Sequence, residues 1–138
     1  MLHIPRRTAS TALALLLAMT LAACSAPAED AGVVFDGTHV AAAAFAEALD
    51  VPGVVVVDVR TPQEFAQGHL PGAVNIDVES PDFGAQVAAL DLDAPHAIYC
   101  RSANRSQVAL AIMAQAGHTQ TLGLAGGIVA WPGAIVTD

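Results

Sequence analysis

Short apolar runs alternate along this chain with longer stretches in which apolar residues recur at helical spacing. The β-branched run Val54–Val57 predicts a strand buried on both faces, and His96–Tyr99 predicts another buried strand. Thr61, Pro62 and Glu64 predict the start of a helix, because they form a capping box with proline at the first helical position. Further strands are expected at 33–35, 73–76 and 119–122, and helices at 39–49, 61–68, 83–90, 106–116 and 126–131.

Strands that alternate with short helices predict an α/β fold with a central, mostly parallel sheet. In such sheets the active site lies at the carboxyl ends of the strands. Asp58 directly follows the first of the two buried strands, and Cys100 directly follows the second. We therefore expect both side chains at the end of the sheet that carries the functional site.

Composition limits the classes of function. The length of 138 residues fits one domain with a sizeable core, which aliphatic residues must fill because aromatic residues are only 4%. The net charge of −8 argues against a nucleic-acid surface, which needs a basic patch, and against direct binding to anionic lipid. The sequence has no internal repeat and no spare apolar stripe, which favours a monomer.

The first residues have the pattern of an export signal. Arg6 and Arg7 precede the apolar run Thr11–Ala23, which is too short to span a bilayer comfortably. The run ends in Leu-Ala-Ala-Cys24, which resembles the lipobox of bacterial lipoproteins. We therefore expect a signal peptide (1–23), a lipidated Cys24 with a flexible tether (24–32), and one domain (33–138) exported from the cytoplasm and held at the bacterial cell membrane only by its lipid. An ordinary secretory signal and a twin-arginine signal are the alternatives.

The positive charges of the expected domain are confined to two short motifs. Lysine is absent, and beyond the leader the only cations are Arg60, Arg101 and Arg105, in a chain with 13 carboxylates. Arg101 and Arg105 follow Cys100 in a polar loop that leads into a helix, where loop N–H groups and the positive helix end favour a thiolate. This arrangement predicts an anion-binding pocket around a reactive cysteine. A buried, inert cysteine with two surface arginines is the alternative.

Three ordered motifs resemble those of rhodanese domains. Asp58–Phe65 together with Gly68–Ile76 resembles their first signature, Tyr99–Ser106 resembles their active-site loop, and Leu124–Trp131 resembles their C-terminal motif. The resemblance extends from about Val33 to Trp131, which is nearly the whole expected domain. It implies a three-layer α/β/α fold with a central, mostly parallel sheet, a sulfurtransferase activity, and no metal or organic cofactor.

The resemblance also implies that Cys100 is the nucleophile. It would accept a sulfane sulfur from a small anionic donor such as thiosulfate and pass it to cyanide, a thiol or a partner protein. The loop that would hold the donor and the persulfide comprises Arg101, Ser102, Ala103, Asn104 and Arg105. Many family members have glycine in place of Ala103, so a left-handed backbone there would cost about 1 kcal/mol.

Three residues outside the loop are expected as structural support: Asp58, Arg60 and His69. Asp58 would bond backbone near the loop and Arg60 would pair with a carboxylate, with direct contact between Arg60 and substrate as the alternative. His69 would pack and form hydrogen bonds, with a Cys–His dyad as the alternative. The other histidines of the expected domain show no metal-ligand spacing and are predicted at the surface. They are His39, His96 and His118.

Two other functions are weighed against sulfur transfer. Related folds in phosphatases and arsenate reductases use a Cys-x5-Arg loop, whereas Cys100 and Arg105 are separated by four residues, and Tyr99 precedes the cysteine in place of the histidine of those phosphatases. The tighter loop suits a single sulfur atom better than a phosphate. A persulfide carrier or redox-sensing binding module without significant turnover is the second alternative.

Overall fold

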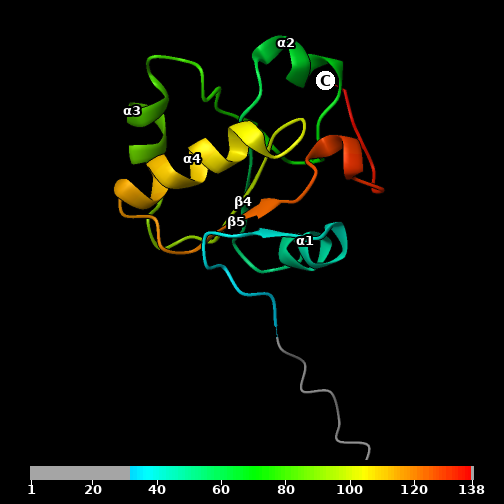
Figure 1. The fold of residues 1–138 in the computed structure, drawn as a ribbon, viewed down its shortest axis with the longest axis horizontal. Helices are drawn as coiled ribbons and strands as arrows, with labels where there is room; N and C mark the ends of the chain where they lie inside the picture. Colours follow the sequence, from blue (N-terminus) through cyan, green and yellow to red (C-terminus); the bar gives the residue numbers. More distant parts are fainter. Residues whose placement is uncertain (1–31, 138) are drawn as a thin grey trace, which may run out of the picture.

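A five-stranded sheet forms the centre of the computed structural model, which describes residues 32–137. The strand order is β1-β5-β4-β2-β3, and every neighbouring pair is parallel (Figure 1). The strands are β1 (His39–Val40), β2 (Val55–Asp58), β3 (Val74–Asn75), β4 (His96–Tyr99) and β5 (Thr121–Leu124). The predicted α/β fold with a mostly parallel sheet is confirmed, and the sheet is parallel throughout. The expected signal peptide, Cys24 and the tether as far as residue 31 lie outside the described residues.

Helices cover both faces of the sheet. They are α1 (Ala42–Leu49), α2 (Pro62–Gln67), α3 (Phe83–Ala88), α4 (Asn104–Gln115) and the 3-10 helix η1 (Ile128–Ala130). Successive strand residues point to opposite faces, so Val57 and Ile98 pack with α3 and α4, whereas Val56 and Ala97 pack in a second cluster with α1. In Figure 1 the strands β4 and β5 lie between α4 and α1. This layering explains why the central strands consist of apolar residues on both faces.

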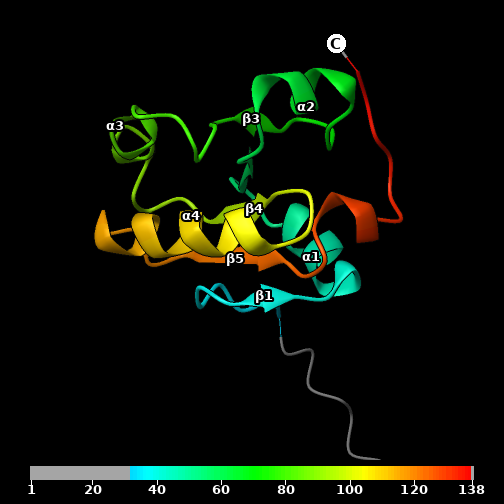
Figure 2. The same cartoon turned by 45° about the horizontal axis from the view of Figure 1, so that its top comes forward.

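The N-terminal strand lies later in the chain than the sequence predicts. Residues 33–35 are not a strand; instead His39 and Val40 pair with β5, at the sheet edge visible in Figure 2. The carboxylate of Asp36 accepts hydrogen bonds from the backbone N–H and the hydroxyl of Thr38, at 3.0 and 2.6 Å. This local turn redirects the chain before it reaches β5, so the helix predicted from residue 39 begins only at residue 42.

The last elements also differ in their bounds. The final strand is Thr121–Leu124, two residues later than the predicted 119–122. Its register is set by the neighbouring central strand, because the backbone N–H of His96 donates to the carbonyl of Gln120 and His96 pairs with Thr121. The helix predicted at 126–131 is the single 3-10 turn Ile128–Ala130.

Two histidines predicted at the surface are buried. His96 is fully buried and His118 is 2% exposed, and their rings meet edge to face with centroids 4.8 Å apart. Burial, followed by the neighbouring His118, lowers the pKa of His96. The prediction was wrong because polarity alone does not show that a central strand and the turn after α4 converge on the same spot.

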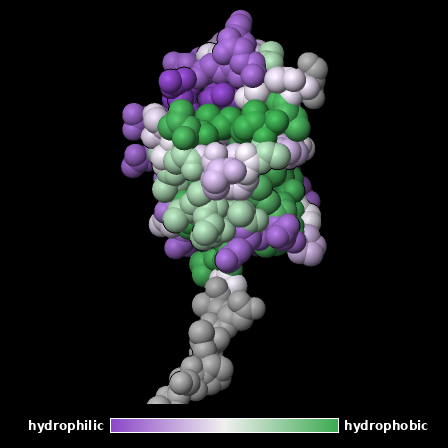
Figure 3. All heavy atoms as spheres, turned by 90° about the vertical axis from the view of Figure 1, so that its right-hand side faces the viewer, coloured by the Kyte–Doolittle hydropathy of each residue, from purple (hydrophilic) through white to green (hydrophobic). Residues whose placement is uncertain are grey.

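One end of the molecule is markedly polar. In the side view of Figure 3, hydrophilic residues gather at the top, where α2 lies, above a band of hydrophobic residues. This polar end lies beside β3, at the edge of the sheet opposite β1 (Figure 2). Within residues 32–137, no helix combines the length and the apolar character that crossing a membrane requires.

Candidate active site

Cys100 lies directly after β4, at the carboxyl end of the central sheet. β2 and β4 are neighbours in parallel register, with Asp58 opposite Tyr99, so Asp58 and Cys100 reach the same end of the sheet as predicted. The Cys100 residue is 1% exposed and belongs to the apolar cluster on the α3 and α4 side. Its thiol donates to the hydroxyl oxygen of Ser106, with 3.6 Å between sulfur and oxygen. The nucleophile candidate is therefore covered, and only a small reagent could reach its sulfur.

The loop after Cys100 leads straight into the N-terminus of α4. Within residues 32–137 the structure shows no acceptor for the backbone N–H groups of Arg101, Ser102 and Ala103. The N-cap of α4 is Ala103, whose side chain cannot cap, so the positive end of this 12-residue helix is uncapped beside Cys100. Free N–H groups at a helix N-terminus are a favourable site for an anion.

Ala103 has a left-handed backbone conformation, the case in which the comparison with glycine at this position predicts a strain cost. Its φ is +78°, and it is the one non-glycine residue with positive φ among those described. An L-residue with a Cβ is strained there by about 1 kcal/mol, whereas glycine is not. The loop therefore keeps its turn in spite of the side chain, at a cost to stability.

The C-terminal motif, Leu124–Trp131, holds the Cys100 loop through backbone hydrogen bonds. The N–H of Ile128 donates to the carbonyl of Cys100 at 2.8 Å, and the N–H of Val129 donates to the carbonyl of Arg101 at 3.4 Å. A Cβ atom on Gly127, where φ is +64°, would lie 2.4 Å from the carbonyl carbon and oxygen of Arg101. This motif needs glycine because the backbone of Gly127 touches the backbone of the loop.

Arg105 is held by the helix that carries the capping box. Its guanidinium donates to both carboxylate oxygens of Glu64, at 2.7 and 2.8 Å, and lies 3.7 Å from Glu79. Glu64 also accepts from the backbone N–H and hydroxyl of Thr61, both at 3.2 Å. Hydrogen bonds from Arg105 lower the pKa of Glu64 to about 2, although burial opposes the shift. Both side chains of the ion pair are about one quarter exposed, so a small anion can reach the guanidinium.

The second arginine, Arg60, is closed off from solvent. It is 6% exposed and donates to both oxygens of Asp58 and to the carbonyl of Gly68. Burial alone would lower the pKa of Arg60, but the hydrogen bonds and charge of Asp58 raise it. Its guanidinium carbon lies 5.7 Å from the ring centroid of Tyr99, whose hydroxyl accepts from the N–H of Leu70. Arg60 thus joins β2 and β4 to the end of α2.

His69 is part of the same packed region. It is 3% exposed, its Nδ1 lies 3.0 Å from the carbonyl of Phe65, and its ring stacks on the Phe65 ring with centroids 3.7 Å apart. Its backbone pairs with Val136 near the C-terminus, with N–H to carbonyl distances of 2.9 Å in both directions. His69 therefore packs against Phe65 and lies within hydrogen-bond distance of the backbone at this position.

The remaining loop residues face outward. Arg101, Ser102 and Asn104 are exposed, and the structure shows no ion pair for Arg101 within residues 32–137. Arg101 therefore lies at the rim of the site, with its charge available to solutes. No group of three or more His, Cys, Asp or Glu side chains in the described part of the chain could hold a metal ion.

Two residues that lie at the site, Ser106 and His39, were not identified from the sequence. Ser106, the last residue of the loop motif, is fully buried and contacts Cys100, which the motif alone does not indicate. His39 was predicted at the surface, but it is half-buried, and its Nε2 lies 2.8 Å from the hydroxyl oxygen of Ser106. Nothing in the local sequence pairs these residues, because they are 67 positions apart and meet only through the strand order.

The fold and the loop geometry agree with the comparison to known families. Residues 41–134 match the family described as the rhodanese-like domain, and the chain belongs to this family. It is 45% identical over 80 residues to the protein of Pseudomonas aeruginosa named thiosulfate sulfurtransferase GlpE, a match that covers 57% of this chain and 70% of that protein. Such relatives support a sulfurtransferase role.

Solved structures show the same architecture. A rhodanese-related protein from Thermoplasma volcanium is similar with a TM-score of 0.65 and 26% identity, over 73% of this chain and 99% of that chain. A structure described as rhodanese with anions from E. coli is similar with a TM-score of 0.52 and 27% identity, over 62% of this chain and 99% of that one.

Proposed function

We propose that this protein is a sulfurtransferase that carries a sulfane sulfur on Cys100. The observation that supports this most directly is the position of Cys100, in a loop with free N–H groups at the uncapped N-terminus of α4. Such an environment stabilises a thiolate and, after transfer, the negative charge of a persulfide. Cysteine in this form needs no metal and no organic cofactor for the reaction.

In the first step the Cys100 thiolate attacks the outer sulfur of a small anionic donor such as thiosulfate. A new sulfur–sulfur bond forms to Cys100, the sulfur–sulfur bond of the donor breaks, and sulfite leaves with the electron pair. The loop N–H groups and Arg105 stabilise the charge that moves onto the leaving group. Arg101 at the rim attracts the donor, and the near-complete burial of Cys100 favours a small donor over a bulky one.

In the second step the outer sulfur of the persulfide passes to a nucleophile. The acceptor attacks that sulfur, and Cys100 leaves as a thiolate, ready for the next cycle. Cyanide serves as the acceptor in an assay, and a thiol or a partner protein is the acceptor in the cell. Relatives named thiosulfate sulfurtransferase, and a similar structure described as containing anions, support this choice of donor class.

Thiosulfate:cyanide sulfurtransferase activity tests the proposal. The purified protein should form thiocyanate, and a Cys100→Ser variant should form none while keeping the wild-type melting temperature. Activity that survives in the variant would contradict the role of Cys100. Sulfur bound to Cys100 without thiocyanate formation would indicate a persulfide carrier, which is the alternative without turnover.

We also propose that the protein is exported and anchored through a lipid on Cys24. The apolar run before Cys24 and the lipobox-like Leu-Ala-Ala-Cys support this location. Metabolic labelling with a fatty-acid analogue should mark the wild-type protein in a bacterial host and fail to mark a Cys24→Ser variant. Equal labelling of the two proteins, or none in either, would contradict the lipid anchor.

A further inference from the structure

Ser106 connects Cys100 to His39 of β1. Its hydroxyl oxygen lies 2.8 Å from Nε2 of His39, 2.9 Å from the carbonyl oxygen of Ala103 and 3.6 Å from the sulfur of Cys100. Ser106 is fully buried, so these neighbours satisfy its hydroxyl. Cys100, Ser106 and His39 therefore form a continuous chain of hydrogen bonds.

The hydroxyl of Ser106 has one hydrogen to give to three neighbours. While Cys100 is a thiol, its S–H donates to the Ser106 oxygen and the Ser106 hydrogen points to the carbonyl of Ala103. Once Cys100 is a thiolate or a persulfide, its sulfur can only accept, so the Ser106 hydrogen must turn toward it. The carbonyl of Ala103 tolerates this, because it also accepts from the N–H of Gln107 at 3.0 Å.

In both states the remaining partner of Ser106 must be a donor. His39 meets this requirement when its Nε2 carries a hydrogen. A hydroxyl that accepts a hydrogen bond becomes a stronger donor, so His39 would strengthen the bond from Ser106 to the sulfur. Burial lowers the pKa of His39, which favours the neutral ring, and the proposed bond requires the tautomer with hydrogen on Nε2.

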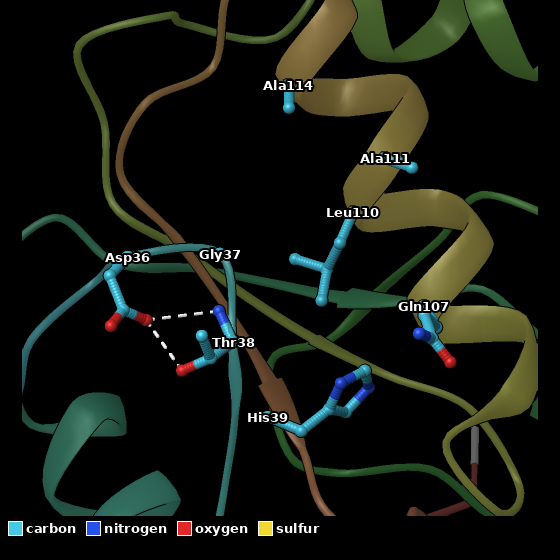
Figure 4. Close-up of a pocket in the computed structure, with 8 residues that line it drawn as sticks. All are labelled: Asp36, Gly37, Thr38, His39, Gln107, Leu110, Ala111 and Ala114. Atoms are coloured by element: carbon cyan, nitrogen blue, oxygen red, sulfur yellow. Dashed lines mark hydrogen bonds between the residues drawn. The ribbon is translucent and has the colours of Figure 1, made fainter.

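The surroundings of His39 hold its ring in this position. A Cβ atom on Gly123 of β5 would lie 2.5 Å from Cδ2 and 2.7 Å from Nε2 of His39, so the absence of a side chain there makes room for the ring. Figure 4 shows the ring extending from β1 toward the side of α4 that carries Gln107 and Leu110, in an open groove of about 560 Å³. The charged group facing this groove is Asp36, whose carboxylate is engaged by Thr38.

We propose that His39 is a positioning residue for Cys100, which acts by donating a hydrogen bond to Ser106 so that Ser106 donates to the thiolate and to the persulfide. The inference rests on the proposed function, since it assumes that Cys100 works as an anion. His39 touches neither the donor nor the transferred sulfur. It acts through Ser106 alone.

The rate of Cys100 alkylation by iodoacetamide as a function of pH tests this directly. The His39→Phe variant keeps a ring against Gly123 but has no donor. Its rate at pH 7 should fall about three- to tenfold, because one hydrogen bond in the chain is lost. The midpoint of its pH–rate curve should move to higher pH, while the plateau at high pH, which reports access to the sulfur, stays at the wild-type level.

A matched pair of amide variants controls for folding. In His39→Gln an amide N–H can take the place of Nε2–H, so its curve should return to that of the wild type. In His39→Asn the amide is one bond too short, so its curve should follow that of His39→Phe. If all three variants have the wild-type midpoint, or if His39→Gln shifts as far as His39→Phe, the proposal is overturned.

A double variant shows whether His39 acts through Ser106. Ser106→Ala should shift the midpoint by itself, and adding His39→Phe should shift it no further. Independent, additive shifts would overturn the relay. Alkylation needs no sulfur donor, so the relay can hold in a protein that fails to transfer sulfur, and an active enzyme with unshifted variants would overturn the relay alone.

Discussion

Two arginine–carboxylate pairs lie near β4 and the loop that follows it, and they differ in how far solvent reaches them. The side chains of Arg60 and Asp58 are both nearly inaccessible to solvent, and Arg60 also donates a hydrogen bond to the backbone carbonyl of Gly68. Arg105 and Glu64 are about one quarter exposed, and join the start of α4 to the start of α2. The first pair links β2 to the end of α2, and the second pair lies beside the Cys100 loop, where solvent reaches it.

The difference shows which arginine can serve an anionic substrate. A buried pair is expensive to separate because a charge without a partner would remain in the interior. A partly exposed pair contributes little to stability, and water or a small anion can replace one partner at low cost. Of the two arginines fixed by a carboxylate, we therefore expect Arg105 to be the one that serves a donor and Arg60 to have a structural role.

The largest expected effect comes from breaking the buried pair. Replacing Arg60 by Met leaves Asp58 buried and unpaired, which should lower the free energy of unfolding by about 3 to 5 kcal/mol. Urea unfolding followed by circular dichroism measures this. The double variant Asp58→Leu/Arg60→Met should lose less than Arg60→Met does, because no lone charge remains. A loss below about 1 kcal/mol in Arg60→Met would mean that the pair does not hold this region together.

Breaking the exposed pair should affect function more than stability. Arg105→Met should cost about 1 kcal/mol of stability, as is usual for a partly exposed ion pair. Its kcat/KM for thiosulfate should fall roughly 10- to 100-fold, since a charged hydrogen bond to the donor is lost. Arg101→Met is the matched control at the rim, and its kcat/KM should fall by a smaller factor. Equal losses of kcat/KM in the two variants would contradict a closer role of Arg105 than of Arg101 in binding the donor.

The strained loop residue offers a change of opposite sign. Ala103→Gly should raise the free energy of unfolding by about 0.5 to 1 kcal/mol, because glycine adopts a φ of +78° without steric strain. The matched control is Ala46→Gly on the exposed side of α1, which should lose about 1 kcal/mol. Thermal unfolding of the two variants tests the comparison. If both are destabilised, the left-handed strain at Ala103 is absent.

The smallest effect concerns the pH dependence of the exposed pair. The pKa of Glu64 falls from 4.5 to about 2 in the folded protein, chiefly through hydrogen bonds from Arg105. A lowered carboxyl pKa stabilises the fold above the unfolded-state value, and this contribution disappears as the pH falls from about 4.5 toward 2. Wild type should therefore exceed Glu64→Gln in stability by under about 1 kcal/mol at pH 6, and the two should converge near pH 2. A difference that is constant with pH would contradict the assignment.

Local patterns predicted those parts of the fold that local physics determines. The β-branched run Val54–Val57 marked β2, and the capping box of Thr61 and Glu64 marked the start of α2; both features are present. The first strand was misplaced because β1 has only two residues, and it exists because β5 is there to pair with it. Strands this short have no pattern of their own.

The site could be predicted only in part for the same reason. The motif around Cys100 indicated the loop, its two arginines, and Ala103 as a residue that stands where many family members have glycine. The partners that cross between elements were not visible in the sequence: Glu64 lies 41 positions from Arg105, and His39 lies 67 positions from Ser106. Such contacts depend on the strand order β1-β5-β4-β2-β3, which no short stretch of sequence encodes.

The central claim is that Cys100 receives a sulfur atom in a loop built to hold its negative charge. Mass spectrometry of the intact protein after incubation with thiosulfate tests it most directly, with Cys100→Ser as the control. The claim predicts a gain of the mass of one sulfur atom on Cys100 in the wild type, which cyanide then removes, and no gain in the variant. An unchanged mass in the wild type, or an equal gain in both proteins, would contradict it.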